Sequence, residues 1–167
     1  MPAKKKEKRK WAIILGASSG FGMASALELA DAGFNICGVH FDRRSAMPAI
    51  NRMRAKIRKK GVEEQFFNMN AADPDNMAIV IKDVRKAAKG VRNPVAVLIH
   101  SLAFGSLHKF VGEKRGEGIK QKQIDLTHNV MANSLLYWVQ ELTYTKSLKF
   151  SHLLVEYFHT VGFCLQN

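Results

Sequence analysis

Cysteine is scarce in this chain of 167 residues, and its two cysteines stand far apart. Cys37 falls in a run that predicts a buried strand, and Cys164 lies near the carboxyl terminus. Two thiols placed in this way make neither a disulfide framework nor a metal site. His100 and the later histidines also have no cysteine or carboxylate at metal-ligand spacing. We therefore expect structural thiols and no bound metal.

Long apolar runs are missing too, since no run approaches the roughly 20 residues that span a bilayer. A basic segment, Lys4–Lys10, precedes the apolar Trp11–Leu15 and gives the start of the chain the outline of a secretory signal. The apolar run stops after five residues in a Gly/Ser loop, and no small-residue cleavage pattern follows. The sequence predicts no membrane span, and we expect a cytoplasmic protein.

Acidic residues are few, with 14 Asp and Glu against 26 Lys and Arg and a net charge of +12. Residues 1–60 hold 14 basic and 4 acidic side chains, so most of the excess lies there. Such an excess suits a nucleic acid, an anionic cofactor or an acidic partner protein. No aromatic residues interleave the basic segments Lys4–Lys10 and Arg52–Lys60, so nucleic acid is the least favoured. We expect residues 1–10 to be a solvated, disordered tail.

Short apolar runs alternate with segments of helical periodicity. The predicted strands are Trp11–Leu15, Asn35–His40, Gln65–Met69 and Val95–Ile99. The predicted helices cover Phe21–Ala32, the segment from Met47 to Gly61, the segment from Asp73 to Gly90, and Ile119–Leu142. Short connections between alternating strands and helices imply right-handed βαβ crossovers. The fold class is therefore α/β, an open parallel sheet of order 3-2-1-4 with helices on both faces.

A glycine- and serine-rich loop joins the first predicted strand to the first helix. Gly16 allows a sharp turn out of the strand, Gly20 allows close approach of a pyrophosphate, and Gly22 allows the helix to pack on the sheet. The helix that begins near Phe21 directs free amide groups at the phosphates. Ser18 and Ser19 add hydroxyl donors. This loop predicts a dinucleotide site in a Rossmann-type domain.

The Gly-x-x-x-Gly-x-Gly spacing resembles that of the short-chain dehydrogenase/reductase family. The segment His100-Ser101-Leu102 and the small residue and Phe104 that follow are similar to the branch containing the enoyl-acyl-carrier protein reductases. The resemblance covers residues 11–142. It implies that His100, Ser101 and Leu102 lie beside the nicotinamide ribose and that Asn70 lies beside the adenine.

The end of the second strand bears on the choice between NADP and NAD. NAD-preferring sites place a carboxylate there, about 20 residues after the glycine loop. His40 occupies that position here, and Asp42 comes slightly late. Arg43 and Arg44 follow, and paired guanidinium groups suit a 2′-phosphate. NADP is the expected cofactor, NAD is the less favoured one, and a pair of arginines on a solvated turn is the alternative.

The chemistry of the family implies a tyrosine acid and a lysine that lowers its pKa, spaced as Tyr-x-x-x-Lys or, in enoyl reductases, Tyr-x6-Lys. No lysine stands four or seven residues after Tyr137, Tyr144 or Tyr157. We assign no catalytic residue. A nucleophilic serine is also not expected, because Ser18 and Ser101 lack a nucleophile-elbow context.

Residues 143–167 depart from the family, and we expect no fifth strand there. Apolar residues from Phe150 to Val161 recur at helical spacing. Two explanations stay open: sequence from a truncation, frameshift or altered splice, or a genuine helix that covers the exposed edge of the fourth strand or binds a partner. On the first explanation, the chain is truncated after the fourth strand and the helix that follows that strand.

Two functions follow as hypotheses. One is an NADP-dependent short-chain oxidoreductase that acts on an acyl or carbonyl substrate of the kind used in fatty acid synthesis, and that is inactive as this chain because it lacks the dyad. The other is a non-catalytic dinucleotide-binding fragment that forms homo- or hetero-oligomers through the predicted helix Ile119–Leu142.

Overall fold

The computed structural model describes residues 9–149 and 154–157. They form a parallel sheet of five strands in the order β3-β2-β1-β4-β5. The elements, in chain order, are β1 (Trp11–Leu15), α1 (Gly20–Asp31), β2 (Asn35–His40), the 3-10 turn η1 (Arg44–Ala46), α2 (Met47–Lys59), β3 (Glu64–Asn68), α3 (Pro74–Ala87), β4 (Val95–His100), α4 (Gln121–His128), the π-helical segment η2 (Asn129–Asn133), α5 (Ser134–Tyr144) and β5 (Leu154–Tyr157). The predicted order of the first four strands is confirmed.

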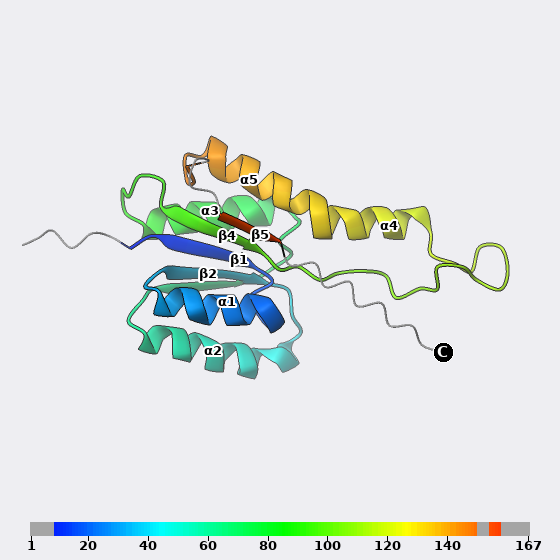
Figure 1. Cartoon of the computed structure of the whole chain (residues 1–167), viewed down its shortest axis with the longest axis horizontal. Helices are drawn as coiled ribbons and strands as arrows, with labels where there is room; N and C mark the ends of the chain where they lie inside the picture. Colours follow the sequence, from blue (N-terminus) through cyan, green and yellow to red (C-terminus); the bar gives the residue numbers. More distant parts are fainter. Residues whose placement is uncertain (1–8, 150–153, 158–167) are drawn as a thin grey trace, which may run out of the picture.

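Helices cover both faces of the sheet, with α1 and α2 on one side and α3 and α5 on the other (Figure 1). The alternation of side chains along β1 divides the core accordingly. Trp11, Ile13 and Leu15 pack in the cluster on the α3 and α5 side. Ala12 and Ile14 pack in the cluster on the α1 and α2 side. Every residue of β1 is buried, as expected for a central strand with both faces covered.

The helix α3 begins where the sequence predicts it. Asp73 is the N-cap, and its Oδ1 accepts hydrogen bonds from the backbone N–H groups of Asp75 and Asn76 at 2.9 and 3.3 Å. Pro74 follows in the first turn, where its missing N–H costs nothing. The loop between β3 and α3 lies beside α5, where Trp138 Nε1 donates a hydrogen bond to the Ala71 carbonyl at 2.8 Å.

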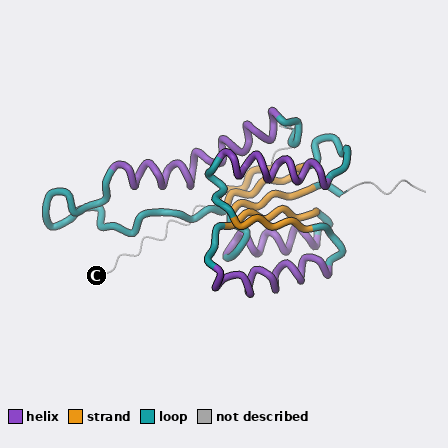
Figure 2. The backbone as a smooth tube through the Cα atoms, turned by 180° about the vertical axis from the view of Figure 1, so that it is seen from behind, coloured by secondary structure: helices purple, strands orange, loops and turns teal. Residues whose placement is uncertain are grey.

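The predicted helix Ile119–Leu142 is present as three joined elements, α4, η2 and α5. Their shared path is interrupted by the π-helical turn Asn129–Asn133. Only α5 is anchored in the core, through buried Ser134, Trp138 and Leu142. No residue of α4 is buried, so α4 extends beyond the sheet (Figure 2).

The segment between β4 and α4, residues 101–120, extends from the body of the protein as an arm (Figures 1 and 2). A hydrogen bond of 2.8 Å from Ile119 N to the Lys109 carbonyl closes its outer part into a loop. Leu107 on this arm is 99% exposed. The arm is therefore held by its own backbone contacts more than by packing.

The expectation that no fifth strand follows is wrong. β5 pairs in parallel with β4, with Val97 opposite Leu154 and His100 opposite Tyr157. The edge of β4 is thus covered by a strand, and Leu154–Tyr157 are not helical. A short apolar run fits both a helical stripe and a strand, and the open edge of a parallel sheet favours the strand. The remainder of the predicted helical stripe, including Phe150 and Val161, lies outside the described residues.

Residues 143–148 belong to the packed part of the fold. Val95 N donates to the Ser147 carbonyl at 2.9 Å. Leu148 is buried in the same cluster as Trp138.

In the part of the chain that the structure describes, no helix has the length and apolar character needed to cross a membrane. The tail residues 1–8 and Cys164 lie outside that part.

Candidate functional site

The glycine loop turns sharply at Gly16, where the backbone has a φ of 88°. The N–H groups of Gly16 and Ala17 both donate to the Val39 carbonyl at the end of β2, at 2.8 and 3.1 Å. A Cβ at Gly16 would lie 2.2 Å from the Ser101 carbonyl oxygen. Only glycine allows this approach, so the loop is held against the ends of β2 and β4.

Gly22 lets the first turn of α1 rest on the same loop. A Cβ there would lie 2.1 Å from the Gly16 carbonyl oxygen. Gly20 differs, because nothing lies within 4 Å of the position its Cβ would take. The loop is therefore tightly packed at Gly16 and Gly22 and open at Gly20, as a loop that accepts a pyrophosphate requires.

The amino terminus of α1 has no side-chain cap and no acidic residue in its first turn. Ser19 is the N-cap residue, but its side chain makes no capping hydrogen bond. The first turn contains no acidic residue. Ser19 and Phe21 are exposed and Ser18 is half-buried. The positive end of the helix dipole thus faces the open space next to Gly20, which favours an anion.

The carboxyl end of β2 is tied down by hydrogen bonds. His40 is buried, and its Nδ1 lies 3.1 Å from Asp42 Oδ2. Burial lowers the pKa of His40, and the neighbouring Asp42 carboxylate opposes that shift. The neutral imidazole then donates to Asp42. His40 is therefore a support for Asp42 and does not face solvent itself.

Asp42 is also held from the neighbouring strand. Its N–H donates to Asn68 Oδ1 at 2.9 Å, and Asn68 Nδ2 donates to the Asp42 carbonyl at 3.0 Å. Arg43 and Arg44 come next and are both exposed. The side chain of Asp42 keeps 27% of its surface accessible. Both the carboxylate and the guanidinium groups are therefore available to a ribose at this edge.

Asn70 follows β3 at the same edge and is exposed. Its Oδ1 accepts a hydrogen bond of 3.0 Å from the Ala72 N–H, and its carbonyl accepts one of 3.1 Å from Asn76 Nδ2. The side chain is thus oriented by the turn that leads into α3. This is the place at which the family resemblance puts an adenine-side residue.

The three site residues predicted at the end of β4 differ in burial and in contacts. Ser101 N donates to the Leu15 carbonyl at 2.8 Å, so Ser101 lies directly beside the glycine loop. Ser101 and Leu102 are half-buried. His100 is 1% exposed, and its Nε2 lies 2.8 Å from Ser134 Oγ on α5. The His100 side chain is therefore buried against α5.

The predicted site residues share one edge of the sheet. In a parallel sheet the carboxyl ends of all strands meet at the same side, and ligands bind in the crevice there. Leu15 is paired with both Val39 and His100, which brings the three strand ends together. The residues gathered along this edge are Gly16, Ser18, Ser19, Gly20, Phe21, Gly22, Arg43, Arg44, Asn70, Ser101 and Leu102.

Two residues of interest were not identified from the sequence. Phe41, the first residue after β2, is 79% exposed at the same edge. Its position directly before Asp42 is the signal that could have identified it. Ser134 is the partner of His100, but the two stand 34 positions apart and share no motif.

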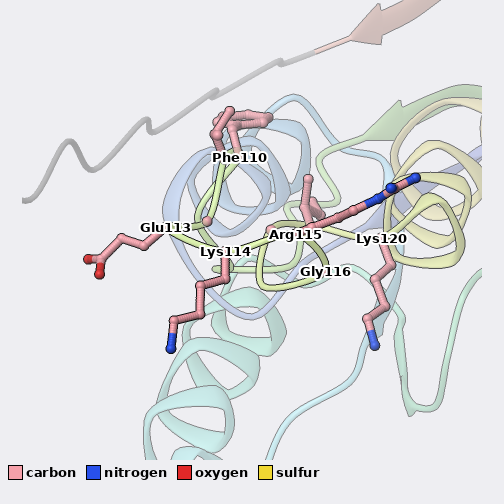
Figure 3. A pocket seen from close by; sticks show the side chains of 10 residues that line it. Phe110, Glu113, Lys114, Arg115, Gly116 and Lys120 are labelled. Carbon is pink, nitrogen blue, oxygen red and sulfur yellow. The ribbon is translucent and has the colours of Figure 1, made fainter.

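Two hollows of the structure lie away from the glycine loop. One, of about 430 Å³, is formed by the outer loop of the arm between Phe110 and Lys120. Figure 3 shows that Lys114 and Lys120 extend away from Phe110 there. A second, of about 310 Å³, is a groove between the start of α3 and the α5 residues Tyr137 and Tyr144. No cluster of His, Cys, Asp or Glu suited to a metal occurs among the described residues.

Curated relatives match part of this chain. A very-long-chain 3-oxoacyl-CoA reductase of Ajellomyces capsulatus is 31% identical over 80 residues, which are 46% of this chain and 24% of the relative. The 3-oxoacyl-[acyl-carrier-protein] reductase FabG of Staphylococcus aureus is 33% identical over 75 residues, or 45% of this chain and 29% of the relative. The matched part is thus less than a third of each relative's length.

Solved structures match more of the chain and show the fold. A Clostridium acetobutulicum trans-2-enoyl-CoA reductase in complex with NAD has a TM-score of 0.66 and 22% identity, over 91% of this chain and 49% of that one. The L-sorbose reductase of Gluconobacter frateurii, complexed with NADPH and L-sorbose, has a TM-score of 0.64 and 21% identity, over 82% and 47%. This chain spans about half the length of those proteins.

The family described as short chain dehydrogenase matches residues 10–146. That range begins just before β1 and ends after α5, so it contains the whole of the glycine loop and all four strand ends of the site. The resemblance stated from the glycine spacing is confirmed. The chain belongs to the short-chain dehydrogenase family.

Proposed function

We propose that this chain forms the cofactor-binding part of an NADP-dependent oxidoreductase. The observation that carries the proposal is the glycine loop, packed at Gly16 and Gly22 and open at Gly20 in front of the amino terminus of α1. The bound dinucleotide would supply a hydride. Ser18, Ser19 and the first amides of α1 would hold its pyrophosphate, and Ser101 and Leu102 would line its nicotinamide ribose.

The preference for NADP rests on charge at the end of β2. Arg43 and Arg44 are exposed, whereas Asp42 shares its carboxylate with the buried His40. Two guanidinium groups bind a 2′-phosphate by charge-assisted hydrogen bonds. Asp42 is the group that favours NAD instead, through the ribose 2′-hydroxyl. The exposed ring of Phe41 offers an apolar face to the adenine, and Asn70 offers a polar group on the other side.

The substrate class that we propose is an acyl thioester or another carbonyl compound, as in enoyl-acyl-carrier protein reductases. The support is the His100-Ser101-Leu102 segment and the names of the curated relatives, which are 3-oxoacyl-CoA and 3-oxoacyl-[acyl-carrier-protein] reductases. We place the protein in the cytoplasm. No tyrosine of this chain has a lysine at the family's spacing, so we propose that this chain binds cofactor without turning over substrate.

The test is a titration of the purified chain with NADPH and NADH, followed by nicotinamide fluorescence. The R43Q/R44Q variant is expected to weaken NADPH binding by about 10- to 100-fold, since each charge-assisted bond contributes about 1.5–3 kcal/mol at most. NADH binding should stay unchanged. The R85Q/K86Q variant on α3 removes the same two charges from the opposite face of the sheet and should bind NADPH as the parent chain does.

Three outcomes would contradict the proposal. Absence of NADPH binding by the folded chain would remove the cofactor assignment. Tighter binding of NADH, lost in D42N, would assign the site to NAD. Hydride transfer to an enoyl or carbonyl substrate by this chain alone would remove the statement that it does not turn over.

A second candidate is a non-catalytic fragment that associates through the helix α4–η2–α5. Exposed apolar side chains along that helix favour it, among them Ile124, Leu126, Leu136 and Tyr137. Sedimentation velocity of the chain, alone and mixed with a full-length relative, tests this. Dimers that L136S and Y137S disrupt would support it, and a monomer at all concentrations would exclude it.

A further inference from the structure

The helix α2 has a strongly basic outer face. Its 13 residues include five basic and no acidic side chains. Ile50, Met53 and Ile57 turn inward and are buried. Arg52, Lys56 and Lys59 are exposed and stand four and three positions apart, so they share the outward side of the helix. These three residues are called the α2 ridge below.

The other cations around α2 are already paired. Glu64 of β3 forms ion pairs with both Arg54 and Arg58, at nitrogen–oxygen distances of 3.0 and 2.6 Å. Lys60, just after the helix, pairs with Asp31 of α1. Within the residues that the structure describes, no ion pair or side-chain hydrogen bond involves the ridge. The charge of the ridge is therefore open to a partner.

Helix stability explains only part of this arrangement. Cations near the end of α2 suit the helix dipole, which accounts for Lys56 and Lys59. Like charges at spacings of three and four positions repel, however, and the first turn of α2 holds no acidic residue. The helix α3 of the same chain has Asp75 in its first turn and Asp83 among its cations. The cations of α2, unlike those of α3, thus have no carboxylate on their own helix.

The kind of partner follows from what accompanies the charges. None of the exposed large apolar side chains of the described residues lies on α2. The ridge thus has no aromatic ring for nucleic-acid bases to stack on and no apolar side chain to enter a lipid surface. Its three cations repeat at helical spacing over about 10 Å. Carboxylates at the same spacing on another helix would face them one to one.

We propose that the α2 ridge is a docking surface for an acidic helix of a partner protein. Arg52, Lys56 and Lys59 each pair with one carboxylate of that helix. The interface is electrostatic and sits on the face of the sheet opposite α3 and α5, away from the apolar groove between those helices (Figure 1). The inference does not rest on the cofactor assignment.

The experiment uses the full chain and a synthetic alanine-based helical peptide with glutamates at positions i, i+4, i+7 and i+11. Binding is measured by fluorescence anisotropy at low and physiological salt. The R52Q/K56Q/K59Q variant keeps residues of good helix propensity and removes only charge. The matched control, K82Q/R85Q/K86Q on α3, removes one arginine and two lysines, also exposed, from the other face of the sheet.

The α2 variant is expected to bind the peptide about tenfold more weakly, because exposed ion pairs contribute little one at a time and add up over three. The α3 control should bind within twofold of the parent chain. An equal loss of peptide affinity in both variants would mean that only the net charge of the chain matters, and would overturn the proposal. Tighter, ridge-dependent binding of a single-stranded RNA or of phosphatidylglycerol vesicles would also overturn it, in favour of that other polyanion.

Discussion

The imidazole of His100 and the hydroxyl of Ser134 form a buried pair, with 2.8 Å between Nε2 and Oγ. Ser134 Oγ in turn donates to the Val130 carbonyl at 2.7 Å, so the Nε2–H of the neutral imidazole is the donor to Ser134. The pair ties the end of β4 to the start of α5 and to the π-helical turn Asn129–Asn133. Such turns occur often at functional sites.

Removal of this pair should affect one end of the cofactor site. S134A removes one hydrogen bond of the buried His100 imidazole, which costs about 0.5–1.5 kcal/mol of stability. On the proposed function, NADPH affinity should fall by about tenfold, because the nicotinamide end lies beside Ser101. Affinity for 2′,5′-ADP, which lacks that end, should not change. Both are measured by calorimetry.

The control for S134A is T143V. Thr143 Oγ1 donates to the Val139 carbonyl at 2.7 Å, the same local bond on the same helix, but contacts no strand residue by hydrogen bonding. T143V should bind both ligands as the parent chain does. Equal loss of NADPH and 2′,5′-ADP affinity in S134A would mean that the pair acts only through general stability.

Acid should destabilise the fold through His40 and His100. Burial holds the pKa of each imidazole below its usual value near 6.5, and for His40 the Asp42 carboxylate only partly opposes this. Below about pH 6.5 the unfolded chain binds protons that the folded chain does not. The stabilising effect of the two neutral imidazoles is thus complete above that pH and is lost as the pH falls toward the folded-state pKa values.

The measurement is urea unfolding between pH 7.5 and 5. The free energy of unfolding should decrease by up to about 1.4 kcal/mol per pH unit for each imidazole. H100Q should lower this slope, whereas H108Q, on the exposed arm, should not. A flat profile down to pH 5 would show that neither histidine is held neutral.

Local rules predicted most of the fold and the turn of the glycine loop. The start of α3 at Asp73 and Pro74 follows from capping chemistry that needs only neighbouring residues. The turn at Gly16 follows in the same way, because glycine spacing after an apolar strand has few other uses. Both features appear in the structure where the sequence placed them.

Features that depend on tertiary context were missed. The sequence does not predict the strand β5, because its four residues are too few for periodicity to distinguish a strand from a helix. Only the vacant edge of β4 decides between them. The contact between buried His100 and Ser134 is not predicted either, because it depends on how α5 crosses the end of β4. Neither relationship is encoded within a single segment.

Glycine replacements should separate strain from steric exclusion. G16A places a methyl group 2.2 Å from the Ser101 carbonyl oxygen at a residue with a φ of 88°, so both effects apply. The expected loss is about 3 kcal/mol or more, together with loss of NADPH binding. G61A also has a positive φ, of 73°, but nothing lies within 4 Å of its Cβ position. It should cost only about 1–2 kcal/mol and leave binding intact.

Thermal and urea unfolding compare the two glycine variants. G22A provides a third case, with a methyl group 2.1 Å from the Gly16 carbonyl and no positive φ. The stability that G22A loses should come from steric exclusion alone and lie between the losses of G16A and G61A. If G16A and G61A lose the same stability, the contact between the glycine loop and the end of β4 is looser than described.

The thiol of Cys37 should report global unfolding. It lies in the interior strand β2 and is fully buried. Burial, with a smaller contribution from Asp83, raises the pKa of its thiol far above the usual value. A buried, protonated thiol does not react with a disulfide reagent. In a C164S background, labelling of Cys37 should be roughly 1,000-fold or more slower in buffer than in 8 M urea, because it requires opening of the core. Labelling that is fast in buffer, and that NADPH does not slow, would mean that β2 opens without unfolding of the sheet.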